Sequence, residues 1–259
     1  MSLYFQVLAS GSRGNAILVS SSTTTILIDA GLSGRELIRR LSLTPLSPRC
    51  LNALVISHEH ADHIKGMGVI SRKLDLPVYL TQGTLEKIPP GVGELASTLV
   101  FQPGNSFHVG DLKITSFPVS HDARQPVGFV IEQDHSRLGI CTDLGFATHL
   151  VRSRLQACNA LILEANHDTR MLLKGPYPPF LKQRIRSRHG HLSNAQTCAL
   201  LPRLYHEDLK IVILAHLSEI NNHPKKVKES LRQMPNSCYW EEVHFEIAKQ
   251  DEVGPGFEI

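Results

Sequence analysis

The chain has 259 residues, 42% of them hydrophobic, which is enough for one large α/β domain or two small ones with packed cores. The formal charge of +3 indicates a mild preference for anionic partners, and the five scattered cysteines, none in a C-x-x-C pair, argue against a disulfide framework or a zinc ribbon. No basic leader opens the chain and no apolar run reaches about 18 residues, so we expect a cytoplasmic protein that is neither exported nor inserted in a membrane.

Short apolar runs separated by turns, with a few amphipathic segments between them, predict a mixed α/β fold. No repeat, low-complexity tract or linker marks a boundary, so we expect a single domain over residues 1–259. The predicted helices are 33–41, which a capping box opens, 64–73, 194–204 and 223–233. The predicted strands are 5–9, 16–20, 25–28, 53–57, 77–81, 98–102, 112–119, 127–132, 138–142, 160–163, 211–215 and 243–248.

Four side chains that can bind metals follow directly after the apolar run 53–56, with the spacing H-x-H-x-D-H. In an extended segment His58 and His60 lie on the same side and can reach one cation. Asp62 and His63 can turn toward a second cation. Imidazole and carboxylate groups at this spacing suit zinc, manganese or iron, so the segment predicts ligands for two divalent metal ions.

Six apolar runs end in, or within two residues of, a His, Asp or Glu. Each such residue alone is more commonly a turn or capping residue. Strand ends on one edge of a sheet can converge, however, and the coincidence with the dense cluster at 58–63 indicates a common site. The residues are Asp29, His58, His121, Asp143, Glu164 and His216.

These residues resemble the pattern of the metallo-β-lactamase fold hydrolases, which have an early Asp, the H-x-H-x-D-H segment and then a separated His, Asp and His. The resemblance covers the chain nearly end to end and implies an α/β fold with four layers, αββα. The stretches 10–15, 164–168, 175–178 and 190–194 also resemble the YycJ/VicX/WalJ branch of bacterial proteins, which is associated with exonuclease activity on nucleic acid. Arg13 departs from the small residue that we expect in the Gly-Ser turn of that branch.

The resemblance also implies how two metal ions would share the ligands. Asp143 would bridge the ions, and Asp29 would orient one ligand through a hydrogen bond, the kind of support that fixes an imidazole tautomer. A turn residue before Gly31 is the alternative for Asp29. The first ion would be held by His58, His60 and His121, and the second by Asp62, His63 and His216.

The charge of such a centre favours phosphodiester hydrolysis. Two divalent cations with two carboxylates and a hydroxide leave the site positive, and coordination can lower the pKa of water from 15.7 to about 7. We therefore expect a nuclease, an exonuclease that cleaves DNA or RNA by a hydroxide held between the ions. His191 would protonate the leaving group and Glu164 would orient His191, as comparable residues do in RNase Z enzymes. The alternatives are that His191 merely packs beside the Ser193 cap and that Glu164 only ends its strand.

The segment 182–189 is locally the most basic part of the chain and lies just before His191. Such a run suits contact with the phosphates of a nucleic acid, and a solvated basic face is the alternative. The segment 175–179 predicts a stiff loop, with Tyr177 or Phe180 either stacking on a base or packing in the core. The predicted substrate-binding residues are Arg13, Asn15, Lys182, Arg184, Arg186, Arg188, Ser193 and Asn194.

A thioester hydrolase of the glyoxalase II type would share the metal ligands and is the alternative function. Few residues follow His216, which leaves little room for the helical substrate-binding part of that family. A secreted β-lactamase is disfavoured because His63 and Asp143 depart from its ligand pattern. A noncatalytic scaffold would be expected to have lost ligands, and none is missing. The sequence leaves open the native metal, the polarity of cleavage and the oligomeric state.

Overall fold

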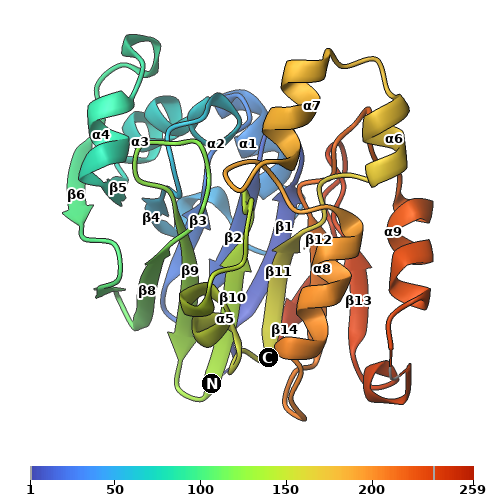
Figure 1. Cartoon of the computed structure of the whole chain (residues 1–259). Helices are drawn as coiled ribbons and strands as arrows, with labels where there is room; N and C mark the ends of the chain where they lie inside the picture. The colour runs from blue at the N-terminus through green and yellow to red at the C-terminus, as the bar shows by residue number, and fades with distance from the viewer. Residues whose placement is uncertain (1, 236) are drawn as a thin grey trace.

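The computed structural model of the chain describes residues 2–235 and 237–259, and within these residues the strands form two sheets of seven strands each (Figure 1). The first sheet has the order β14 (Gly256–Glu258), β1 (Tyr4–Ala9), β2 (Ala16–Ser20), β3 (Thr25–Ile28), β4 (Leu51–Val55), β5 (Pro77–Thr81) and β6 (Ser97–Phe101). The second has the order β13 (His244–Ile247), β12 (Ile211–Ala215), β11 (Ala160–Glu164), β10 (Ser136–Cys141), β9 (Val127–Gln133), β8 (Leu112–Pro118) and β7 (Ser106–Val109).

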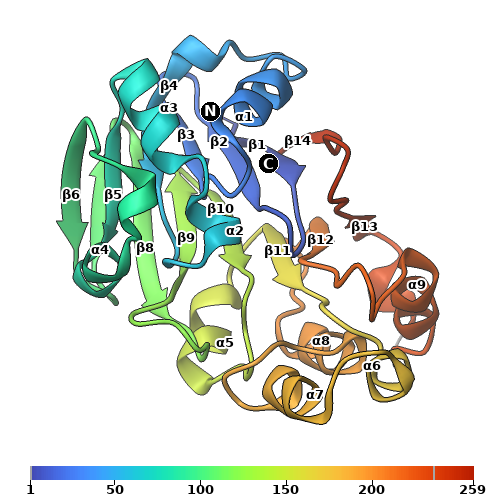
Figure 2. The same cartoon turned by 90° about the horizontal axis from the view of Figure 1, so that it is seen from above.

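Helices cover the outer faces of both sheets, so the molecule has four layers when it is seen from above (Figure 2). The first sheet packs against α1 (Gly34–Leu41), α2 (Ala61–Ile64), α3 (Met67–Leu74) and α4 (Gln82–Lys87). The second sheet packs against α5 (His149–Leu155), α8 (Asn194–Leu200) and α9 (Pro224–Arg232). In Figure 1, α6 (Thr169–Lys174) and α7 (Pro179–Arg186) lie near the top of the molecule. Short 3-10 helices are Pro48–Cys50, Pro90–Val92, Leu201–Arg203 and Ser237–Trp240.

Three apolar cores fill the spaces between these four layers, and they confirm the predicted αββα fold. In β3, Ile28 is buried in the core between the sheets, and its neighbour Leu27 is buried against the helices. In β11, Ile162 is likewise buried between the sheets, and Leu163 is buried against the helices of the second sheet. Successive side chains of a strand point to opposite faces, so a strand covered on both sides reads as a continuous apolar run.

The direction of the strands brings the residues that follow them to one edge of the molecule. The strands from β3 to β6 are parallel to one another, and so are those from β10 to β13. β8 runs in the same direction as β10, because both are antiparallel to β9. The carboxyl ends of β3, β4, β8, β10, β11 and β12 are the six strand ends at which the sequence predicts a site.

The predicted strands are confirmed to within two residues at each end. The helix expected at 64–73 is wrong in one respect, because it is divided into α2 and α3. The amide of Gly66 donates to the carbonyl of Ala30 and not to the carbonyl four residues earlier, which interrupts the helix. The helix expected at 194–204 ends at Leu200, and Pro202, which has no N–H group, lies in the 3-10 turn that follows.

The strands β7 and β14 and the helices from α4 to α7 lie outside the predicted elements. The helix α7 has no buried side chain, so no apolar stripe in the sequence indicates it. The segment 175–178 is a loop as predicted, and Pro179 opens α7. The side chain of Phe180 is 72% exposed and does not pack in the core. Among the described helices, none is long and apolar enough to cross a membrane.

Candidate active site

The segment that carries four of the predicted ligands connects β4 to α2. His60 is the residue that precedes the first turn of α2, and Asp62 and His63 lie within that turn. The change from extended to helical backbone turns the second pair of side chains away from the first. Each pair then meets a third side chain from a distant part of the chain.

The first group consists of His58, His60 and His121, which follows β8. The Nε2 atom of His58 lies 3.0 Å from the Nδ1 atom of His60, and the Nε2 atom of His121 lies 3.2 Å from the same atom. Nitrogen atoms that share a tetrahedral zinc ion at about 2.0–2.1 Å lie about 3.3 Å apart. Because the ligand atoms of all three residues also lie within 4.8 Å of one another, they can share one metal ion.

The second group consists of Asp62, His63 and His216, which follows β12. The Oδ2 atom of Asp62 lies 3.6 Å from the Nε2 atom of His63 and 3.4 Å from the Nε2 atom of His216. Asp62 and His63 follow β4 of the first sheet and His216 follows β12 of the second, so the group joins the two sheets at the edge that their carboxyl ends form. The division into two groups is the one that the family resemblance implies.

Asp143, which follows β10, lies between the two groups. Its Oδ2 atom is 3.1 Å from the Nε2 atom of His63, and its Oδ1 atom is 3.5 Å from that of His216 and 3.7 Å from that of His121. The carboxylate is buried, yet Oδ2 accepts no hydrogen bond within the described residues. A buried carboxylate oxygen without a donor is costly unless a cation occupies the space beside it, so this donor set fits two divalent ions.

Asp29 fixes the orientation of His63. Its Oδ2 atom accepts a hydrogen bond from the Nδ1 atom of His63 at 2.7 Å and another from the hydroxyl of Ser57 at 2.9 Å. Its Oδ1 atom accepts the backbone N–H of Ser57 at 2.8 Å. Because the proton of His63 is held on Nδ1, the lone pair of Nε2 faces the candidate metal position. Of the two interpretations of Asp29, these contacts match the orienting one.

Glu164 contacts the Nδ1 atoms of His191 and His216, as Asp29 contacts the Nδ1 atom of His63. Its Oε1 atom lies 2.7 Å from the Nδ1 atom of His191 and 3.2 Å from the Nδ1 atom of His216. Its Oε2 atom accepts the backbone N–H groups of Leu144 and Leu192, each at 2.9 Å. The buried carboxylate therefore joins two histidines to two loops, and it does more than end β11.

Burial and charge together set the ionisation of this cluster. Burial holds the pKa of His58 well below its ordinary value, so this ring is neutral. Burial also opposes protonation of His63 and His216. The carboxylate of Asp29 nevertheless raises the pKa of His63 well above its ordinary value, and the carboxylate of Asp143 does the same for His216. Burial opposes ionisation of Asp143 too, yet the charges of His216 and His63 keep its pKa well below the usual range. The carboxylates of the site therefore favour positive charge beside them, which a divalent cation can supply in place of the protons on the histidines.

Three residues of the cluster have a left-handed backbone that is uncommon outside glycine. The φ angles are 60° at Asp29, 55° at Asp143 and 56° at His216. Each residue comes directly, or one residue, after the end of its strand. The left-handed turn bends the chain at the sheet edge, and it is a local cause of the convergence of these side chains.

A pocket of about 240 Å³ opens beside the ligands and is bordered on one side by α7 and the loop before it. Tyr177 and Arg184 line this side, and His191 lines the pocket among the ligands. The guanidinium of Arg184 forms an ion pair with Asp122, which also lines the pocket. Asp122 was not predicted, and the signal that could have indicated it is its position next to His121.

The other basic side chains of the segment 182–189 have no acidic partner among the described residues. Lys182 donates a hydrogen bond to the carbonyl of Leu173 at 2.8 Å. Arg186 is exposed, and the guanidinium of Arg188 lies 4.6 Å from the centre of the Phe146 ring. Within the described part of the chain, none of these three cations is in an ion pair.

Arg13 and Asn15 have contacts of a different kind. Arg13 forms ion pairs with Glu219 at 3.3 Å and with Asp251 at 2.6 Å. Asn15 is buried, and its Nδ2 atom donates to the backbone carbonyl and to the Oδ2 atom of Asp62, both at 3.3 Å. Arg13 is thus turned toward acidic side chains and Asn15 supports a candidate ligand; contact of either with substrate stays a prediction.

Ser193 and Asn194 also have structural partners. Ser193 forms the capping box of α8 with Gln196. Asn194 is buried, and its amide exchanges two hydrogen bonds of 2.9 Å with the amide of Asn222. Contact of these two residues with substrate likewise stays a prediction.

Comparisons with known proteins agree with this architecture. A family model described as the beta-lactamase superfamily domain matches residues 24–217, which include all the predicted metal ligands. The chain is 35% identical to exodeoxyribonuclease YycJ of Bacillus anthracis, over 90% of this chain and 89% of that protein. It is 36% identical to exodeoxyribonuclease WalJ of Streptococcus pneumoniae, over 84% of this chain and 82% of that protein.

A solved structure shares the fold. The metallo-beta-lactamase fold protein YhfI from Bacillus subtilis superposes with a TM-score of 0.76 at 17% identity, over 100% of this chain and 99% of that one. The predicted fold and the resemblance to the YycJ/WalJ branch are thereby confirmed, and the glyoxalase II alternative is not favoured. By its family match, its relatives and its fold, the chain belongs to the beta-lactamase superfamily.

Proposed function

We propose that this protein is a metal-dependent exonuclease that removes nucleotides from an end of a DNA strand. The observation that carries the proposal is a cluster of candidate metal ligands beside a basic helix, both bordering one pocket. Cations of the metal centre and of α7 together would attract the phosphates of a nucleic acid. The two relatives named exodeoxyribonuclease support DNA as the substrate and attack from an end.

The proposed metal centre uses the two groups of ligand atoms described above. Asp143 would bind both ions through its two oxygens. Nitrogen and carboxylate ligands suit zinc or manganese, with iron as the third choice. His58, His60 and His121 would hold one ion, and Asp62, His63 and His216 the other.

When bound, the ions would activate a water molecule and neutralise charge on the phosphoryl oxygens. His191 would then give a proton to the leaving oxygen from Nε2, because Glu164 holds its Nδ1 atom at 2.7 Å. Burial opposes protonation of this ring, but the carboxylate of Glu164 outweighs it and raises the pKa of His191. Asp29 would act as a positioning residue by keeping the proton of His63 on Nδ1.

The strand would enter along α7. Arg184 lines the pocket, and Lys182, Arg186 and Arg188 extend the basic surface away from it. Tyr177 is also at the pocket and offers a ring for stacking. A cytoplasmic location is part of the proposal, supported by cysteines that form no disulfide among the described residues.

The experiment offers metal-reconstituted protein end-labelled DNA and RNA, each single- and double-stranded, alongside a glutathione thioester. We expect stepwise loss of nucleotides from one end of DNA. His58→Ala should abolish this activity, whereas His108→Ala, which changes an exposed histidine on β7, should retain it. Hydrolysis of the thioester alone would overturn the proposal, and degradation of RNA alone would refute the choice of DNA.

A further inference from the structure

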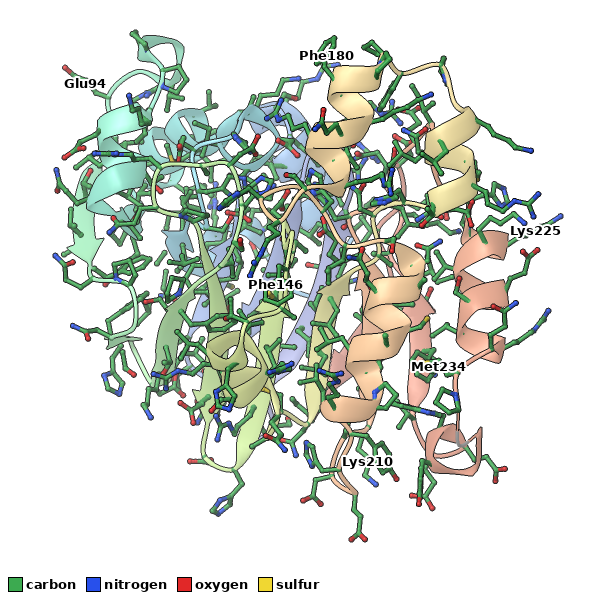
Figure 3. All side chains as sticks on the ribbon, in the orientation of Figure 1. Glu94, Phe146, Phe180, Lys210, Lys225 and Met234 are labelled. Atoms are coloured by element: carbon green, nitrogen blue, oxygen red, sulfur yellow. The ribbon has the colours of Figure 1, made fainter. Side chains whose placement is uncertain are left out.

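A second cavity lies next to the candidate active site, between α5 and α8 on the outer face of the second sheet. It has a volume of about 200 Å³, below the range of about 300–1,000 Å³ that is typical of sites for whole small molecules. Phe146, Arg152, Leu192, Gln196 and Arg203 form most of its lining, and we call it the α5–α8 groove. Figure 3 labels Phe146 on the face of the molecule that carries α5, α7 and α8.

The groove and the catalytic pocket share a common wall. Leu192 of the groove follows His191 of the pocket, and a second segment leads from Asp143 to Phe146. A side chain at Gly145 would lie 2.4 Å from the carbonyl oxygen of Arg188. The segment 143–146 is therefore in close backbone contact with the segment 188–190, which leads to His191. A strand that leaves the pocket over this wall therefore reaches the groove next.

Hydrogen bonds hold this wall in place. The amide of Gly145 donates to the carbonyl of Ser120 at 2.8 Å, and the hydroxyl of Ser120 donates to the carbonyl of Arg188 at 2.7 Å. The groove therefore has a fixed position relative to the candidate ligands His121 and Asp143, which flank the same segments.

The chemistry of the lining points to a nucleotide. The Phe146 side chain is 42% exposed, and the guanidinium of Arg188 lies over its ring at 4.6 Å from the ring centre. An exposed aromatic ring beside arginines is the combination with which single-stranded nucleic acid is bound, because every base can stack and every nucleotide has a phosphate.

The surrounding sequence is depleted of acidic residues. Between residues 144 and 206 only Glu164 and Asp168 are acidic. Glu164 is buried behind the active site, and Asp168 caps α6. Within the described part of the chain, Arg152 and Arg203 form no ion pair. The Arg and Lys residues of this stretch are Arg152, Arg154, Arg170, Lys174, Lys182, Arg184, Arg186, Arg188 and Arg203.

We propose that the α5–α8 groove binds a nucleotide of the substrate strand that lies outside the catalytic pocket. Its base stacks on Phe146, and Arg152 and Arg203 bind phosphates on either side. The occupant is single-stranded, because a paired base inside a duplex does not offer its face to an aromatic ring. This inference rests on the proposed nuclease function and adds a substrate subsite to it.

The test of the arginines measures binding of a fluorescent, hydrolysis-resistant phosphorothioate DNA strand of about 12 nucleotides to the metal-loaded protein. Each lost phosphate contact lowers the slope of log affinity against log salt by about 0.7 for a single strand. Arg152→Gln with Arg203→Gln should therefore reduce the slope by about 1.4. The control is Arg35→Gln with Arg49→Gln, which removes the same charge from exposed positions on the first-sheet side and should leave the slope unchanged.

The test of the ring uses Phe146→Leu and Phe146→Trp. The leucine variant should bind the strand about 5- to 150-fold more weakly, with an unchanged salt slope, because stacking is lost and no phosphate contact is. The tryptophan variant should retain binding. Thermal denaturation of both variants checks that they fold, and equal loss of affinity in both would contradict a stacking role.

The proposed nucleotide subsite is disproved if wild-type protein does not bind the strand. It is also disproved if the arginine and leucine variants bind the strand with the affinity and the salt dependence of the wild type. Hydrolysis of unmodified DNA and of bis(p-nitrophenyl) phosphate, which is too short to reach the groove, tests the nuclease function separately. Hydrolysis with unaltered strand binding in the variants would reject the groove alone. Strand binding that depends on the groove, without hydrolysis, would reject the nuclease function alone.

Discussion

Replacing Asp29 by asparagine tests how the site selects the tautomer of a ligand. The amide oxygen must accept the backbone N–H of Ser57, which lies 2.8 Å from Oδ1. The amide nitrogen then replaces Oδ2, which lies 2.7 Å from the Nδ1 atom of His63. Two N–H groups would face each other there, so His63 would move its proton to Nε2 and lose the lone pair that faces the metal position.

Loss of such a supporting contact lowers metal affinity about 10- to 100-fold, which is about 1.4–2.7 kcal/mol. The affinity is measured by chelator competition on purified Asp29→Asn, and metal content is measured by elemental analysis. Asp75→Asn is the matched control, because Asp75 has the same left-handed backbone, with φ of 51°, and is exposed. Equal affinities of Asp29→Asn and wild type would refute the tautomer argument.

Three further predictions concern proton transfer, charge and packing. His191→Ala should lower turnover about 100-fold or more while metal content stays at the wild-type level, and an unchanged rate would exclude the proton-donor role. Glu36→Gln should lose about 1 kcal/mol of stability near neutral pH, because hydrogen bonds from Arg39 and Arg40 lower the pKa of Glu36 to about 2. That stability is present above the ordinary pKa of a glutamate and is lost as the pH falls toward about 2, so denaturation curves of the two proteins should converge in acid. Phe129→Ala should cost about 3–5 kcal/mol in urea denaturation, because the ring is completely buried between the sheets, and a loss below about 1 kcal/mol would contradict the described packing.

The sequence predicted the parts of the fold in which a local pattern and the tertiary structure agree. The central strands, such as β3, β11 and β12, are buried on both faces, so each appears as an apolar run, and the chemistry-bearing residues follow these runs directly. The helix α7 could not be recognised, because it lies at the pocket rim without burying a side chain.

The candidate site shows the same limit. The ligands follow a spacing that the sequence displays, but several partners are set only by the folded chain. Asn194 meets Asn222, and Arg13 meets Asp251, across 28 and 238 positions. No local pattern indicates such contacts, so the sequence predicts that Asn194 and Arg13 bind substrate, while the structure gives both residues partners within the protein.

The left-handed backbone at Asp29, Asp143 and His216 implies a trade-off between stability and function. Such a conformation costs about 1–3 kcal/mol at a residue other than glycine. Glycine would remove this strain, but it would also remove the side chain on which the site depends. The protein therefore keeps backbone strain at three positions because the site needs their side chains. A substitution that relieves the strain at one of them would therefore be removed by selection for activity, whatever it does to stability.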